Sequence, residues 1–144
     1  MARVLIVEDE ADIAELLRFS LELEGHEAVL APTGAAALEQ IARRPPDVVL
    51  LDLMLPDVPG TRICRRLKED PRTKDIPVVI VSSLAREQER VKALETGADD
   101  FVTKPFSIRE LMLRLAAVLR RAPLPVSAPP RPSPSGRTRS PRRT

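Results

Sequence analysis

The sequence is poor in the residues on which disulfide frameworks and histidine chemistry depend. Its 144 residues include one cysteine, Cys64, and one histidine, His26. A single cysteine excludes an internal disulfide framework, and such a residue is most often a small buried hydrophobe. The only histidine is not a convincing partner for a cysteine nucleophile. The composition therefore argues against disulfide scaffolds and Cys–His catalytic centres.

Long apolar runs are also missing. No run approaches the roughly 18–20 residues that a membrane span needs. The N-terminus reads Met-Ala-Arg, followed at once by a short apolar segment and acids, which is not the pattern of a signal peptide. We therefore expect a soluble, cytoplasmic protein without a membrane span.

Acidic residues are absent from the last part of the chain. Residues 122–144 contain five arginines, no acid and seven of the fifteen prolines, whereas residues 1–121 hold 18 basic and 21 acidic residues, a net charge of −3. A segment of this composition buries too little apolar surface to offset its ordering entropy. We expect a mildly acidic domain at 1–121 and a disordered Pro/Arg/Ser-rich tail at 122–144.

Short apolar runs within residues 1–121 predict the strands of a mainly parallel sheet. Four runs stand out, and three of them are rich in β-branched residues without alternation, as in strands buried on both faces. They are Val4–Val7, Val48–Leu51, Val78–Val81 and the weaker Phe101–Val102. A fifth candidate, His26–Ala31, is placed toward an edge of the sheet.

Helical patterns separate these runs and end at glycine or proline. The expected helices are Glu10–Glu24, Gly34–Arg44, Gly60–Lys68, Leu84–Thr96 and a last one from Ser107 to about Arg121. Ser107 with Glu110 three residues later is typical of a capping box. Five strands alternating with five helices predict an α/β domain. Spacing alone does not give the strand order.

Polar side chains follow these strands where ligands bind to open α/β sheets, at the carboxyl ends. They are Glu8 and Asp9, Asp52, Ser82 and Ser83, and Thr103 and Lys104. Singly, each is an ordinary turn, cap or solvated residue. Together, three carboxylates repel one another and require a cation, and hard oxygen ligands suit Mg²⁺. With an ammonium and a hydroxyl beside them, they predict a site for a phosphoryl group.

Four segments carry a resemblance to a known family: VLIVEDE at 4–10, LLDLMLPD at 50–57, IPVVIVS at 76–82 and GADDFVTKPF at 97–106. Residues 1–121 resemble the receiver domains of two-component response regulators over their whole length. Each segment alone is modestly specific, but all four in this order are highly specific. The resemblance implies a flavodoxin-like (βα)5 three-layer sandwich with strand order 2-1-3-4-5.

The resemblance also implies a reaction. A sensor histidine kinase, or a histidine phosphotransfer protein, would donate a phosphoryl group to Asp52. The metal, Mg²⁺ or Mn²⁺, would be held by Glu8, Asp9, Asp52 and the backbone carbonyl of Met54. Met54 also stands where aspartyl-nucleophile phosphohydrolases need a second acid, so we expect a signalling switch and not an enzyme.

Further residues receive roles from the same resemblance. Lys104, the Ser82 hydroxyl and the Ser83 backbone would contact the phosphate, and a cis bond before Pro105 would aim the lysine. Ser82 and Phe101 would form the switch that reshapes the face built from the fourth helix, fifth strand and fifth helix. Apolar residues at Met54 and Leu84 predict slow loss of the phosphate.

Residues 90–121 look especially like receivers joined to winged-helix DNA-binding domains, which dimerise through that face. The pairs Arg90 with Glu110 and Asp100 with Arg114 occupy positions suited to ion pairs across a dimer. The alternative is that these are ordinary solvated helix charges, since exposed pairs contribute little individually.

No output domain follows Arg121 in the sequence, so we expect a stand-alone receiver that reaches a downstream protein target. Two alternatives stay open: a phosphate shuttle in a phosphorelay, and a non-phosphorylated pseudo-receiver that acts as an interaction module. The tail is either inert or makes weak electrostatic contact with nucleic acid, membrane or an acidic partner, or offers a proline-rich docking segment at 129–132.

Overall fold

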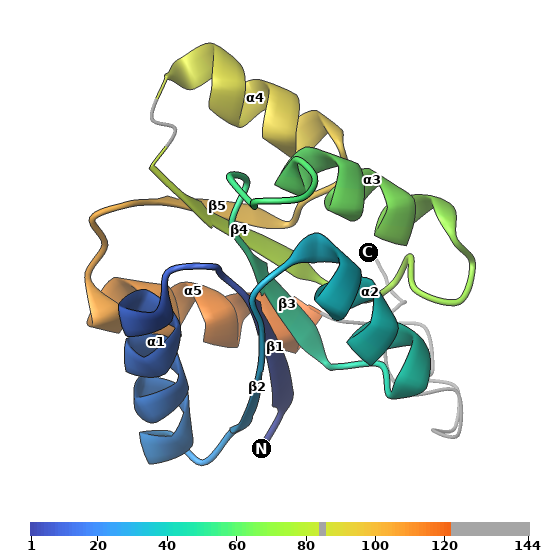
Figure 1. The fold of residues 1–144 in the computed structure, drawn as a ribbon. Helices are drawn as coiled ribbons and strands as arrows, with labels where there is room; N and C mark the ends of the chain where they lie inside the picture. Colours follow the sequence, from blue (N-terminus) through green and yellow to red (C-terminus); the bar gives the residue numbers. More distant parts are fainter. Residues whose placement is uncertain (84–85, 122–144) are drawn as a thin grey trace, which may run out of the picture.

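A five-stranded parallel sheet forms the centre of the protein (Figure 1). The computed structural model describes residues 1–83 and 86–121. The strands are β1 (Arg3–Val7), β2 (Glu27–Ala31), β3 (Val48–Leu51), β4 (Val78–Ser82) and β5 (Asp100–Thr103). They lie in the order β2-β1-β3-β4-β5, with every neighbouring pair parallel. The flavodoxin-like order that the resemblance implies is confirmed, and β2 lies at an edge as expected.

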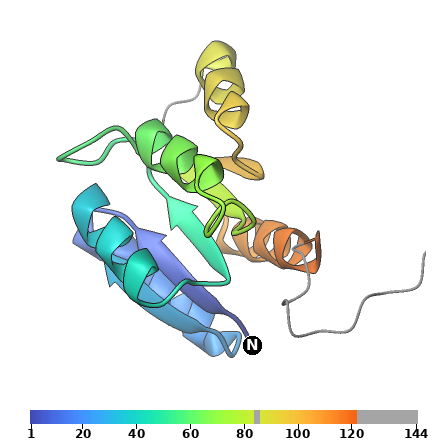
Figure 2. The ribbon, with the colours of Figure 1, turned by 90° about the vertical axis from the view of Figure 1, so that its right-hand side faces the viewer.

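Five helices alternate with the strands and cover both faces of the sheet (Figures 1 and 2). They are α1 (Ala11–Leu23), α2 (Gly34–Arg43), α3 (Gly60–Glu69), α4 (Glu87–Glu95) and α5 (Ile108–Arg121). One apolar cluster packs α1 and α5 against one face, and a second packs α2, α3 and α4 against the other. The expected three-layer sandwich is therefore confirmed.

The buried strands explain the apolar runs of the sequence. All four residues of β3 are at most 1% exposed, and they alternate between the two clusters: Leu50 contributes to one and Leu51 to the other. Burying such a side chain fully contributes about 1.5–3 kcal/mol relative to leaving it exposed. Because both faces are covered, both sets of side chains must be apolar, and the sequence shows no alternation.

The start of α4 differs from the expectation. We expected a helix from Leu84, but the helix begins at Glu87, and residues 84–85 lie outside the described residues. Arg86 has extended backbone angles (φ −66°, ψ 139°), which a residue inside a helix does not adopt. Glu87 and Glu89 lie in the first turn, where negative charge interacts favourably with the helix dipole.

The start of α5 carries only half of the expected capping box. The Ser107 hydroxyl accepts a hydrogen bond from the Glu110 backbone N–H at 3.2 Å, while the Glu110 carboxylate pairs with Arg114 instead of closing a capping box. Among the described residues, no helix is long and apolar enough to cross a membrane. The tail expected at 122–144 lies outside the described part of the chain.

Candidate functional site

Three charged side chains meet at the carboxyl edge of the sheet. Glu8 directly follows β1, Asp52 follows β3, and Lys104 follows β5. Because the strands are parallel, these ends lie at one edge, and the backbone continues the pairing there: the Asp52 N–H donates to the Val7 carbonyl at 3.0 Å. The topology therefore brings together residues that are far apart in the sequence.

Lys104 connects the acids of this edge. Its Nζ donates to Glu8 Oε1 at 2.8 Å, to Asp52 Oδ2 at 3.0 Å and to Glu10 Oε1 at 3.2 Å. The Glu8 and Asp52 side chains are only 3% and 5% exposed, whereas Glu10 is exposed. We call Glu8, Glu10, Asp52 and Lys104 the acidic site. The ammonium offsets the repulsion between two buried carboxylates.

Burial and pairing act in opposite directions on the pKa values of the site. Burial raises the pKa of Glu8, although hydrogen bonds from Lys104 and from the Glu10 backbone oppose the rise. Burial lowers the pKa of Lys104, but the hydrogen bonds to Glu8 and Asp52 outweigh it, and the net pKa is raised. Lys104 therefore stays protonated at neutral pH and provides a fixed positive charge.

The structure places Glu10, not Asp9, in the group of acids. Ligand oxygens of Glu8, Glu10 and Asp52 lie within 4.8 Å of one another, whereas Asp9 is exposed and outside that group. Sequence reasoning missed Glu10 because it considered only the first two acids after the strand. Alternation along an extended chain, which puts residues two apart on the same side, is the signal that could have found it.

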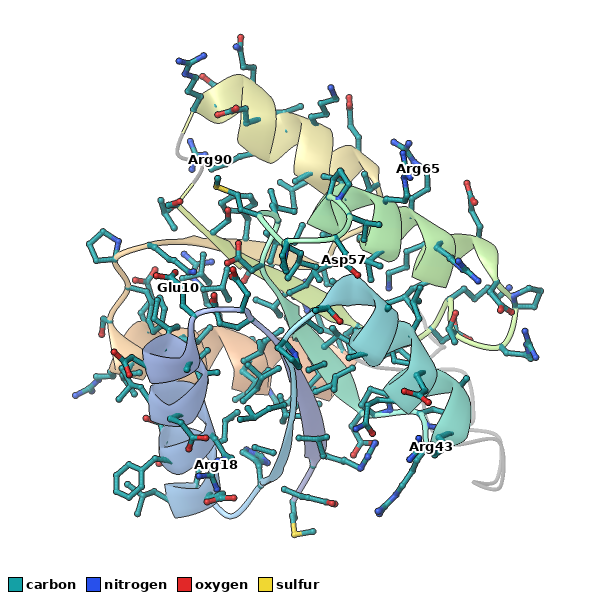
Figure 3. The ribbon with its side chains drawn as sticks, in the orientation of Figure 1. Glu10, Arg18, Arg43, Asp57, Arg65 and Arg90 are labelled. Atoms are coloured by element: carbon teal, nitrogen blue, oxygen red, sulfur yellow. The ribbon has the colours of Figure 1, made fainter. Side chains whose placement is uncertain are left out.

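The three carboxylates suit a divalent cation. They are hard oxygen donors on neighbouring loops, and Mg²⁺ binds such ligands while keeping several waters. An acidic cluster of this kind is typical of the Mg²⁺ site of receivers. Figure 3 shows Glu10 at this end of the molecule, above α1. The ligand roles of Asp9 and of the Met54 carbonyl stay predictions.

The loop after Asp52 leaves the sheet and returns to it. The Met54 N–H donates to Asp52 Oδ1 at 3.0 Å, and Met54 forms an antiparallel bridge with Pro59. Gly60 then donates its N–H to the Leu53 carbonyl at 2.8 Å. A Cβ at Gly60 would lie 2.3 Å from the Asp52 carbonyl oxygen, so only glycine permits this close return.

Ser82, Ser83 and Phe101 lie on the side of β4 and β5. Ser82 is fully buried at the end of β4, and Ser83 is exposed, with its Oγ 3.8 Å from the Met54 sulfur. Phe101 is half-buried and packs against the cluster of α2, α3 and α4. The bond between Lys104 and Pro105 is cis, as the resemblance implies. The phosphate and switch roles of these residues stay predictions.

The charges expected at a dimer face form pairs within the chain. Arg114 contacts both Asp100 oxygens through its Nη1 and Glu110 Oε2 through its Nε, each at 3.1 Å. Arg90 is exposed (Figure 3). Nothing in a single chain tests whether Arg90 and Glu110 meet across a dimer, so that pairing also stays a prediction.

Comparison with known proteins gives the family. The sequence pattern of the response regulator receiver domain matches residues 4–116. The phosphate regulon transcriptional regulatory protein PhoB of Rhizobium meliloti is 45% identical over 122 residues, which cover 85% of this chain and 54% of that protein. The sensory transduction protein RegX3 of Mycobacterium bovis is 49% identical over 121 residues, 84% of this chain and 52% of that protein.

The relatives also define how far the match extends. The chain spans about half the length of the curated relatives it matches. These relatives are winged-helix regulators of the OmpR/PhoB family, so the expected resemblance to receivers of that type is confirmed. A solved receiver domain, that of the Francisella response regulator 1452, has a TM-score of 0.79 and 31% identity, and the match covers 84% of this chain and 98% of that one. The chain therefore belongs to the response regulator receiver domain family.

Proposed function

We propose that Asp52 accepts a phosphoryl group from a phosphohistidine of a partner kinase or phosphotransfer protein and so acts as a signalling switch. The observation that carries the proposal is the contact of the half-buried Lys104 ammonium with both Glu8 and Asp52 at the carboxyl edge of the sheet. A carboxylate that is to attack a phosphate needs nearby positive charge, because both reactants are negative.

The step uses groups that the structure brings together. An Asp52 oxygen forms a bond to phosphorus while the bond between phosphorus and the donor's imidazole nitrogen breaks; the electron pair of that bond stays on the nitrogen, and the histidine side chain leaves as neutral imidazole. Met54 N–H donates to Asp52 Oδ1 and Lys104 Nζ donates to Oδ2, each at 3.0 Å, so the carboxylate is oriented through both of its oxygens. During the transfer, the positively charged Lys104 ammonium, which donates to Oδ2 before the reaction, would move toward the oxygens of the phosphoryl group.

A divalent cation belongs to this proposal. Glu8, Glu10 and Asp52 would hold it, together with the predicted contributions of Asp9 and the Met54 carbonyl. When bound, Mg²⁺ or Mn²⁺ supplies electrostatic stabilisation for the charge on the phosphoryl oxygens. The backbone of Ser83 and the hydroxyl of Ser82 would contact the same oxygens.

The proposal is tested by intact-mass measurement after incubation with acetyl phosphate and Mg²⁺. The wild type should gain the mass of one phosphoryl group, and Asp52→Asn should gain none. Glu15→Gln, a change at an exposed acid of α1 away from the acidic site, is the matched control and should react as the wild type does. An equal gain in Asp52→Asn would place the acceptor elsewhere, and no gain in the wild type would favour a pseudo-receiver. Since Met54 is apolar and cannot orient a water, the adduct should then decay slowly after the reagent is removed.

The output of the switch is also a proposal. On phosphorylation, the Ser82 hydroxyl would turn to the phosphate and the Phe101 ring would move inward, which changes the α4–β5–α5 face. Arg114 pairs with Asp100 and Glu110 within the chain, so a dimer that uses these charges must exchange existing pairs for new ones. Light scattering with and without beryllofluoride should show a larger mass with it, and Arg90→Glu should prevent the increase.

A further inference from the structure

Asp57 fastens the loop that follows Asp52 to the beginning of α2. Its Oδ1 accepts the Gly34 N–H at 2.9 Å and its Oδ2 accepts the Ala35 N–H at 2.9 Å, while Oδ1 also accepts the Val58 N–H at 3.0 Å. Figure 3 shows Asp57 at one end of α2, with Arg43 at the other. A single exposed carboxylate thus connects two segments that lie more than twenty residues apart in the sequence.

This contact is separate from the ordinary cap of α2. Thr33 is the N-cap residue, and its Oγ1 accepts the Ala36 N–H at 3.0 Å. The helix therefore has its own cap in Thr33, and Asp57 takes up the two free N–H groups that Thr33 leaves. Those two hydrogen bonds lower the pKa of Asp57, so the carboxylate is ionised at neutral pH.

The two segments are shaped to fit one another closely. A Cβ at Gly34 would lie 2.6 Å from Val58 Cγ2 and 3.3 Å from Asp57 Oδ1, so a larger residue there would push the loop away from α2. The loop is also held at its base, where Gly60 returns against the Asp52 carbonyl. Between these two attachments lies Met54, whose N–H orients the Asp52 carboxylate.

We propose that Asp57 is a positioning residue, which holds the Met54 stretch and the Asp52 carboxylate in the geometry that takes up a divalent cation. The inference rests on the proposed function of Asp52. The attachment at α2 fixes the tip of the loop and the attachment at Gly60 fixes its base, so the backbone between them has little freedom. Without the Asp57 contact the tip of the loop loses its hydrogen bonds to α2, and more of the loop must be ordered when the cation binds.

The test is Mn²⁺ affinity, measured by electron paramagnetic resonance of the free ion, with amide hydrogen exchange of the metal-free protein beside it. Asp57→Ala should weaken Mn²⁺ binding about tenfold, the lower end of the effect of residues that support metal ligands from behind. Exchange should speed up at the amides of Gly34, Ala35 and Val58. Asp57→Asn, which keeps one oxygen acceptor, should show a smaller loss of affinity.

Two controls separate positioning from simple stabilisation. Thr33→Ala removes the cap that α2 owns and should lower Tm and the protection of the Ala36 amide, yet bind Mn²⁺ as the wild type does. Asp75→Asn removes an exposed acid for which no hydrogen bond is found among the described residues and should change neither property. At saturating Mg²⁺, phosphorylation of Asp57→Ala by acetyl phosphate should recover the wild-type rate, because the defect lies in cation uptake.

Wild-type Mn²⁺ affinity in Asp57→Ala, with protection of Gly34 and Ala35 lost, overturns the inference. If Asp57→Ala does not fold, Asp57→Asn gives the same decision: unchanged affinity with reduced protection at these two amides overturns it. A wild type that binds Mn²⁺ but takes no phosphoryl group contradicts only the proposed function. The Mn²⁺ affinities of the Asp57 variants and the wild type still test the role of Asp57.

Discussion

Replacing Lys104 by methionine removes the charge of the acidic site while keeping most of the volume of the side chain. Glu8 and Asp52 then face each other with almost no exposure to solvent and without the hydrogen bonds at 2.8 and 3.0 Å. Leaving one side of a buried ion pair uncompensated is strongly destabilising. We expect the variant to fold with a large, pH-dependent loss of stability.

The size of the loss follows from proton binding. The folded variant can relieve the repulsion by protonating one carboxyl group, whose ordinary pKa is 4.5 for Glu8. At pH 7 this requires about 3 kcal/mol, at about 1.36 kcal/mol per pH unit, which sets the upper limit of the electrostatic loss. At pH 5 the same limit is below about 1 kcal/mol.

The pH range in which stability falls differs between the two proteins. The folded variant binds more protons than its unfolded chain, so its stability falls as the pH rises from 5 to 7. In the wild type the raised pKa of Lys104 contributes stability that is fully present below the ordinary value of 10.5 and is lost only as the pH rises through the higher folded value. Lys104 therefore adds no slope to the wild type between pH 5 and 7.

Urea unfolding followed by circular dichroism in EDTA measures both quantities. With a slope of about 1.5–2 kcal/mol/M, the midpoint at pH 7 should fall by about 1.5–2 M. Lys92→Met, which removes an exposed charge of α4, is the matched control and should change the midpoint little. An equal loss at pH 5 and pH 7 would refute the reasoning, because it would assign the loss to packing. Adding Mg²⁺ should restore stability more in Lys104→Met than in the wild type.

Three further experiments test other parts of the structure. Gly60→Ala should destabilise the fold by about 2–3 kcal/mol, because its Cβ meets the Asp52 backbone, and urea unfolding measures the loss; a stability equal to the wild type's would contradict the close return. Cys64 should not react with Ellman's reagent until the protein unfolds, since its side chain is fully buried and burial raises the pKa of the thiol. The difference in stability between the wild type and Asp57→Asn should be constant above the ordinary pKa of 3.8 and should shrink as the pH falls through the lower folded pKa. The reason is that a lowered carboxyl pKa stabilises the folded state only while the group is ionised. Unfolding curves from pH 7 to pH 3 measure the difference, and a difference that grows toward acid pH contradicts the prediction.

The sequence predicts the parts of this structure that follow from the burial of the strands and from their parallel direction. A run such as Val48–Leu51, apolar at every position, indicates a strand covered on both faces, and β3 is such a strand. Once the strands are parallel, the residues that follow them must share an edge. Glu8, Asp52 and Lys104 could therefore be predicted to meet without knowledge of the strand order.

Other parts depend on geometry that spacing does not carry. Three acids follow β1, and the two-residue alternation that puts Glu10 beside Glu8 and leaves Asp9 exposed applies only if the backbone stays extended after Val7, which the sequence does not settle. The contact of Asp57 with Gly34 joins the loop after β3 to the start of α2, and no period or motif relates the two. The start of α4 was missed because Arg86, an ordinary helix former, has extended backbone angles here.

The distances along the chain between the charged groups have a consequence for biosynthesis. Lys104 lies 96 positions after Glu8 and 52 after Asp52, so no local fragment contains the acidic site. It exists only after β5, the last of the five strands of this sheet along the chain, has paired with β4. A nascent chain, or one truncated before residue 104, has Asp52 without its cationic partner. On the function proposed above, competence to receive a phosphoryl group would therefore arise only when the whole sheet is complete.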